Sequence, residues 1–448
     1  MNVMADVKVM KTAAETALAN AYAEARTRLP GDDTVAARRA AAFDLFAREG
    51  LPHRRVEEWK YTDLRALMRD AKPLAGAPDA SAKARAKAAG AFLGDVESRR
   101  LVFVYGAFVP ELSDTSALEK GLIVRSLADA LSGSDPILAT HLGKLAPATD
   151  IAVALNTAMM SDGAVIGVGA GATIERPLHL SFVASRKPAA SFVRSLVVVE
   201  EGARVMLIES HEGLPACDYQ VNAALELFVG DEAHVDHVKI IAEGTGALHV
   251  STLAAAIGAK ARFNSFSFVT GGVVVRNQLF LNFDGEDTVA GIRGATLLRG
   301  KQHADTTLVA NHIARGCQSR EVFKSVLDDE AHGVFQGRII VKPGAQHTDA
   351  KMMTRALLLS ERAEADNKPE LEIFADDVQC GHGATAGALD EELKFYLMAR
   401  GIPAAEAEAL LVQAFLGEAV EGIEHAGLRE VLMDQVATWL RTRAQDAR

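Results

Sequence analysis

Hydrophobic positions change their spacing twice along this chain, and each change marks a different kind of structure. Between residues 35 and 46, apolar side chains recur every three or four positions, which predicts one face of an amphipathic helix. Gly50 and Pro52 follow and signal its end. Alanine-rich, charged sequence continues through residues 64–92. We therefore expect residues 1–95 to form an N-terminal helical domain.

Short β-branched runs replace the helical spacing near residue 100. Residues 101–106 predict a first strand and residues 122–131 predict a helix. From Gly163 onward, short apolar runs are separated by glycines. We expect a β core over residues 96–388 and a C-terminal helical domain over residues 389–448. Helical spacing returns there in three segments, residues 391–400, 404–416 and 428–440.

An internal repeat runs through the β region. Four similar segments begin with glycines at nearly equal intervals, Gly202, Gly230, Gly258 and Gly285. Residues 328–332 echo residues 231–234. Such a regular period is typical of a β-solenoid, because a single coil cannot bury its apolar face without the next one. Glycine at the corners would supply positive φ angles.

Two other β-containing folds are possible alternatives to the solenoid. A β-sandwich with evenly spaced turns remains an alternative. A doubly wound α/β fold is disfavoured, because no helical pattern long enough for a crossover interrupts residues 163–350.

Composition narrows the possible partners. The chain has 448 residues, of which 49% are hydrophobic, and a net charge of −11 with no long basic block, so nucleic-acid binding is not expected. We see no secretory signal and no apolar run long enough for a membrane span. The three cysteines, at positions 217, 317 and 380, form no CxxC pair and are odd in number. These features favour a cytoplasmic protein without a disulfide framework.

Motifs for common enzyme chemistry are missing from the sequence. Gly300 and Lys301 lack both the glycine spacing and the following Ser or Thr of a phosphate-binding loop. Residues 167–171 are glycine-rich but lead into Pro177 and not into a helix, which indicates a solenoid corner. No GxSxG motif is present. We therefore expect that no nucleotide binds this chain, that it does not hydrolyse ATP, and that it is not a serine hydrolase.

Most of the thirteen histidines are scattered. His234 and His237 are three positions apart in a predicted strand, so they should face opposite sides and make a poor metal pair. Four more could converge in a solenoid, although spacing alone does not show it, and a surface or hydrogen-bonded histidine is the simpler interpretation of each. These are His303, His312, His332 and His347.

Cys380 and His382 differ from the other candidates. They lie two positions apart, so in an extended strand both side chains point to the same face. Thiolate and imidazole are suitable ligands for iron–sulfur species, and Gly381 and Gly383 leave room for a nearby object. Two ligands cannot hold a cluster alone, so such a site needs donors from elsewhere. The alternative is a buried free cysteine beside a surface histidine.

Two stretches resemble the SufD branch of the SufB/SufD iron–sulfur assembly family. Residues 311–387, which include DDVQCGHGATAG, are similar to that branch nearly throughout, and PHRRVEEWKYT at residues 52–62 resembles the segment P-x-R-x-x-E-x-W-K-Y-T of the family. The resemblance spans most of the chain and is weakest between residues 65 and 190. It implies a right-handed parallel β-helix flanked by helical domains.

The resemblance also implies a function and partners. Family members assemble a transient iron–sulfur cluster at an interface with a SufB paralogue, while the SufC ATPase supplies the nucleotide chemistry. By match, the contributed histidine is His382, with Cys380 beside it, and the C-terminal helices bind SufC. A homodimer is expected when the chain is isolated. Two alternatives remain: a purely structural solenoid module, and a β-helix polysaccharide lyase or hydrolase.

Overall fold

The computed structural model describes residues 10–446 apart from residues 134 and 185. It is a parallel β-solenoid of about eight turns, with helices before and after it, as the sequence predicts. From β4 onward, successive strands alternate between two sheets, so each strand pairs in parallel with the strand two places along the chain. His303, for example, pairs with His332, which occupies the same position in the next coil.

The first sheet, called sheet A below, runs in the order β18, β16, β14, β12, β10, β8, β6, β4 and β3. Its strands are β3 (Leu122–Ser126), β4 (Ala164–Val168), β6 (Ala190–Val199), β8 (Gln220–Val229), β10 (Leu248–Ile257), β12 (Val274–Phe283), β14 (His303–His312), β16 (His332–Val341) and β18 (Glu364–Ile373).

The second sheet, sheet B, runs from β19 through the odd-numbered strands to β5, β1 and β2. Its strands are β1 (Arg99–Val104), β2 (Ala107–Phe108), β5 (Leu178–Val183), β7 (Arg204–Glu212), β9 (His234–Ala242), β11 (Arg262–Val269), β13 (Val289–Leu298), β15 (Gln318–Leu327), β17 (Asp349–Leu358) and β19 (Gln379–Ala388).

The core lies between the two sheets, where side chains of the same kind stack from coil to coil. In sheet A, one interior row consists of paired leucines whose side chains are at most 1% exposed, Leu225, Leu253, Leu279 and Leu308. Alternation along each strand sends the next residue to the outer face. Each coil therefore buries its apolar row against its neighbours, which is the physical reason for the repeat.

The corners confirm the repeat but correct its explanation. Gly202 has a positive φ of 65°, as expected, whereas the other three repeat glycines do not. In their coils the positive φ falls two residues later, at Glu232, Lys260 and Asp287. Glycine is needed there for space: a Cβ at Gly285 would lie 1.8 Å from the backbone nitrogen of Ala259 in the previous coil. The echo at residues 328–332 lies at the opposite corner, between β15 and β16.

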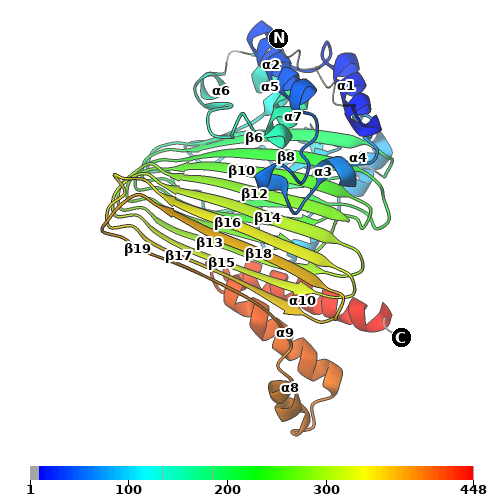
Figure 1. Ribbon diagram of the computed structural model, residues 1–448. Coiled ribbons are helices and arrows are strands. Elements are labelled where there is room, and N and C mark those ends of the chain that lie inside the picture. The colour runs from blue at the N-terminus through cyan, green and yellow to red at the C-terminus, as the bar shows by residue number, and fades with distance from the viewer. Residues whose placement is uncertain (1–9, 134, 185, 447–448) are drawn as a thin grey trace, which may run out of the picture.

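The N-terminal helices gather at one end of the coil stack (Figure 1). They are α1 (Ala13–Ala25), α2 (Asp33–Glu49), α3 (Leu64–Leu67), α4 (Ala80–Ala86), α5 (Leu127–Ser132), α6 (Pro136–His141) and α7 (Ile151–Met159). Gly50 ends α2, as predicted. The expected helix over residues 122–131 is wrong in its first half: residues 122–126 form β3, which pairs antiparallel with β4, and Ser126 then caps α5.

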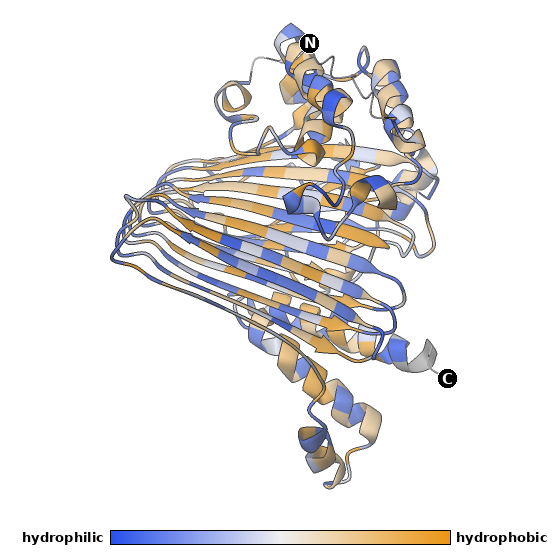
Figure 2. Ribbon diagram, viewed as in Figure 1, coloured by the Kyte–Doolittle hydropathy of each residue, from blue (hydrophilic) through white to orange (hydrophobic). Residues whose placement is uncertain are grey.

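The C-terminal helices are α8 (Glu391–Met398), α9 (Ala404–Val420) and α10 (Ala426–Asp446). α9 and α10 cover the outer face of sheet B, where Leu416 and Leu432 belong to the same buried cluster as Phe268. α8 projects beyond the coils (Figure 1). The strands of sheet A carry more hydrophobic residues near the N-terminal helices and more hydrophilic ones toward β18 (Figure 2).

Candidate functional site

Cys380 and His382 lie on β19, the last strand of sheet B. β19 pairs with β17 on one side, and its other side is the edge of the sheet. Gln379 donates its backbone N–H to Thr348 next to β17 at 2.8 Å. Because N–H groups alternate in direction along a strand, those of Cys380 and His382 point to the open edge.

The two side chains face the solenoid interior at its open end. Cys380 pairs with buried Ala350 and packs against the main core, and His382 pairs with Met352, another core residue. Both side chains therefore extend the rows of the core by one position. His382 is nevertheless exposed, because no further coil covers it. The shared face that the two-residue spacing predicts is present in the structure.

Glu321 lies in the same interior row, two coils below His382. It pairs with Met352 on β17, which in turn pairs with His382. Glu321 is fully buried, and neither carboxylate oxygen has a hydrogen-bond partner among the described residues. Burial raises the pKa of Glu321 to about 7, so this side chain can hold or release a proton near neutral pH.

The Cys380 thiol is held in its protonated form at neutral pH. Burial raises its pKa, and the nearby carboxylates of Asp349 and Glu321 raise it further. Iron binds the thiolate and not the thiol, so ligation of iron by Cys380 must release a proton. His382 is more accessible than Cys380 and carries no such requirement when its imidazole is neutral.

Other histidines behave as the sequence suggests, with one exception. His237 is buried and bonded to Glu209, apart from His234. His303 and His332 do converge, with their Nδ1 atoms 3.2 Å apart across neighbouring coils. The other two expected partners lie elsewhere: His312 stacks on Phe283, and His347 pairs with Asp377 at a corner.

The WKYT segment docks on sheet A and leaves a cavity of about 410 Å³ beside Trp59. Trp59 stacks over the guanidinium of Arg276 at 4.4 Å, and Thr62 donates its hydroxyl to Asp305 at 2.5 Å. Arg276 and Asp305 are both fully buried and form an ion pair. These contacts give the segment a packing role against sheet A.

Comparison with known proteins assigns the family. The family model described as "SUF system FeS cluster assembly, SufBD core domain" matches residues 182–415. The model described as "SufBD protein N-terminal region" matches residues 12–180. An iron–sulfur cluster assembly SufBD family protein of Synechocystis sp. is 33% identical over 410 residues, covering 89% of both chains. This chain belongs to the SufBD family.

Two relatives within the SufBD family carry the name SufD. The iron–sulfur cluster assembly protein SufD of Escherichia coli is 31% identical over 394 residues, covering 87% of this chain and 89% of the relative. SufD of Bacillus subtilis is 26% identical over 390 residues, covering 85% and 88%. The resemblance found in the sequence is therefore confirmed, and this SufBD protein has a role in iron–sulfur cluster assembly.

Two features of this SufBD chain become visible only in the structure. Glu321 looks like an ordinary core position in sequence, and only the coil register places it below His382. The buried group of His211, Glu243 and His249 has no sequence signal either, because Glu243 lies in a corner and the separations of the three residues match no single coil length. Within the described ranges, none of the helices has the length and hydropathy needed to cross a bilayer.

Proposed function

We propose that this SufBD chain is a non-catalytic scaffold subunit on which a transient iron–sulfur cluster is built. The observation that carries the proposal is the position of Cys380 and His382, side by side on one face of the last strand. They supply two ligands, one thiolate and one imidazole, for iron, which arrives together with sulfide as cargo. The remaining ligands come from a second chain that pairs with the same edge.

The partner at this edge is a SufB-like paralogue. β18 and β19 are ten residues long each, and both end their sheets. Such long edges present rows of unpaired N–H and C=O groups that a strand of another chain can bond. Isolated copies of this chain use the same edge to form a homodimer.

Glu321 assists ligation by Cys380. The thiol must lose a proton when it binds iron, and Glu321 is the buried carboxylate whose charge already acts on it. Glu321 lies in the interior row next to that of Cys380, and a carboxyl group with a pKa of about 7 can take up that proton.

ATP hydrolysis belongs to a separate, SufC-like subunit, because this chain has no phosphate-binding loop in its sequence. The subunit docks on the C-terminal helical domain, residues 389–448. The supporting observation is α8, which exposes Leu393, Phe395 and Tyr396 by more than half of each side chain. Exposed aromatic residues in one short helix are typical of a protein interface. The whole complex acts in the cytoplasm.

The test uses His382→Ala and Cys380→Ser in the assembled complex, with iron and sulfide content and visible absorption as readouts. We expect His382→Ala to lower the cluster yield at least about tenfold while the complex stays intact. His347→Ala is the matched control, because that histidine lies at a corner and pairs with Asp377. Full cluster yield in the Cys380→Ser/His382→Ala double variant would instead establish a purely structural module.

A further inference from the structure

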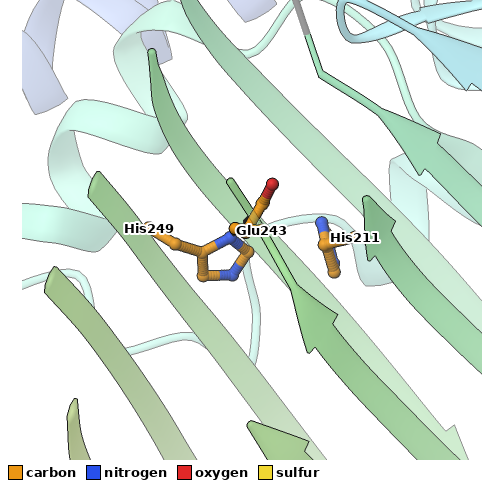
Figure 3. Close-up of side chains that lie close together, drawn as sticks. All are labelled: His211, Glu243 and His249. Carbon is orange, nitrogen blue, oxygen red and sulfur yellow. Dashed lines mark hydrogen bonds and ion pairs between the residues drawn. The ribbon is translucent and has the colours of Figure 1, made fainter. Parts of the chain in front are cut away.

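Three buried ionisable side chains meet inside the solenoid, away from β19. His211 lies near the end of β7, Glu243 in the corner after β9, and His249 in β10. One nitrogen or oxygen atom from each lies within 4.8 Å of those of the others. Figure 3 shows the three side chains side by side. Two imidazoles and a carboxylate are thus gathered at one point within the coils.

Hydrogen bonds fix only one side of this cluster. Glu243 accepts from Nδ1 of His249 at 2.9 Å and from the hydroxyl of Tyr219 at 2.5 Å. The hydroxyl of Tyr219 in turn accepts the N–H of Gly244 at 2.8 Å. These contacts orient the carboxylate and one imidazole, as supporting hydrogen bonds do around bound metal ions.

On the other side of the cluster, three ring nitrogens have no hydrogen-bond partner among the described residues. His211 is 1% exposed and His249 is fully buried. Both ring nitrogens of His211, and Nε2 of His249, have no hydrogen-bond partner within residues 10–446 as described. Buried polar atoms without a partner destabilise a fold, so three of them at one point call for a bound species.

The ligand atoms are in the right chemical form for a cation. Burial, and then the neighbouring His249, hold the pKa of His211 well below its usual range. Because neither ring nitrogen is hydrogen-bonded, the neutral imidazole of His211 can present a lone pair to a metal ion. Glu243 adds a carboxylate at 6% exposure, so the group can offset part of the positive charge of an ion.

We propose that His211, Glu243 and His249 bind one divalent transition-metal ion, such as Zn²⁺ or Fe²⁺. Two imidazoles and one carboxylate are a ligand set that these ions favour. The 2.9 Å hydrogen bond between Nδ1 of His249 and Glu243 holds both side chains in place and leaves Nε2 of His249 and both nitrogens of His211 for an ion. The ion links β7, a corner and β10, so it ties neighbouring coils together.

This site is distinct from the edge that builds clusters, and it does not depend on the proposed function. It uses no sulfur ligand and lies in earlier coils, enclosed on all sides. Because its ligands are buried, the ion exchanges slowly and remains with the chain through purification.

The experiment measures metal retained by the purified full chain. Cells are grown with added Zn²⁺ or Co²⁺, the chain is dialysed against a chelator, and metal is counted by mass spectrometry. We expect about one ion per chain, and at least about tenfold less in His211→Ala and His249→Ala. Cys380→Ala/His382→Ala should retain the full amount, which separates this site from the cluster edge.

Two control variants sharpen the result. His312→Ala removes a buried histidine that stacks on Phe283, and His234→Ala removes part of a second, more exposed group with Asp236 and Glu424. Both should keep the ion. Loss of metal in His234→Ala, or equal metal in His211→Ala and wild type, would overturn the proposal, as would a metal-free wild type.

X-ray absorption of the wild-type chain covers the case in which the two histidine variants do not fold. The Zn²⁺ or Co²⁺ spectrum should show nitrogen and oxygen neighbours with imidazole scattering. A sulfur neighbour would contradict the assignment, since no cysteine belongs to this ligand set.

Discussion

The two ends of the coil stack treat their sheet edges in opposite ways. At the first end the sheets finish in β2 and β3, which have two and five residues and pair antiparallel with their neighbours. At the last end they finish in β18 and β19, which have ten residues each. Short edge strands prevent pairing with other chains, whereas long ones invite it. The first end is therefore closed and the last end open.

Burial differs in the same direction. At the closed end, helices α5 and α6 cover the outer face of sheet A, and Leu127 and Leu138 join the cluster of Val165. At the open end, Ile373 and Phe374 expose 43% and 58% of their surface. Exposed apolar side chains at a long sheet edge are what the proposed partner at the open end would cover. The contrast teaches that Cys380 and His382, the proposed cluster ligands, lie where the fold is left incomplete.

The largest expected change in unfolding free energy comes from breaking a buried ion pair near the closed end. A more exposed ion pair near the open end is the comparison. Arg194 and Glu226 are both at most 1% exposed and lie 2.7 Å apart. Glu226→Ala leaves the guanidinium buried without its partner, which should cost about 3–5 kcal/mol in urea unfolding. Glu370→Ala breaks the 3.4 Å pair with Arg338, whose side chains are 27–36% exposed, and should cost about 0–1 kcal/mol.

A double variant is the control for this ion pair. Arg194→Met/Glu226→Leu removes both charges, so it should lose less stability than Glu226→Ala alone. A double variant as unstable as the single one would show that packing, and not the unpaired charge, is responsible.

Matched leucines test the hydrophobic side of the comparison. Leu180 on β5 is fully buried, whereas Leu371 on β18 is only partly buried against the same core. Leu180→Ala should lower the free energy of unfolding by about 2–5 kcal/mol, and Leu371→Ala by about 1 kcal/mol in the isolated monomer. Equal losses, measured by urea denaturation at dilute protein, would mean that the last coil is as well packed as the first.

The pH dependence of stability tests Glu321, which lies in the interior row that leads to His382 at the open end. Burial holds the pKa of Glu321 at about 7, above the value of about 4.5 that it has when unfolded. Its stabilising contribution is thus complete below about pH 4.5 and is lost as the pH rises through 7. The loss amounts to about 3 kcal/mol at most, from 1.36 kcal/mol for each pKa unit.

Glu321→Gln removes this titration and keeps the shape of the side chain. The difference in unfolding free energy between wild type and variant should therefore shift in favour of the variant between pH 5 and pH 8. Parallel stability profiles over that range would show that Glu321 is already ionised in the folded chain.

The solenoid and the shared face of Cys380 and His382 can be predicted from residue spacing in the sequence. The exposure of His382 cannot. The nearly even spacing of the repeat glycines identified the solenoid, and the two-residue spacing placed Cys380 and His382 on one face. Both are local relations. The exposure of His382 depends instead on which coil is last, and that is decided by the whole chain.

Longer relations between coils escaped the sequence for the same reason. Glu321 lies below His382 only because two successive coils, of slightly unequal length, bring positions 321, 352 and 382 into one row. The separations among His211, Glu243 and His249 match no single coil length. Residues 122–126 look helical next to α5, but tertiary pairing with β4 makes them a strand.

The smallest effect on the isolated chain, and the sharpest test of the open end, comes from Ala384→Pro. The N–H of residue 384 points to the open edge, because Gln379 donates toward β17 and the direction alternates. Proline is tolerated at such edge positions, so the unfolding free energy of the monomer should change by less than about 1 kcal/mol. It removes one donor that a partner strand needs and places its ring in the path of that strand.

Ala384→Val keeps the N–H and is the matched control. Association with a second chain, measured by sedimentation at increasing concentration, should weaken at least about tenfold in Ala384→Pro and remain near wild type in Ala384→Val, because one lost edge bond and a steric block together exceed about 1.4 kcal/mol. If both variants associate as wild type does, the partner binds the face of the solenoid and not its edge. Cys380 and His382 would then have to find their other ligands within this chain, and the asymmetry between the two ends would need another cause.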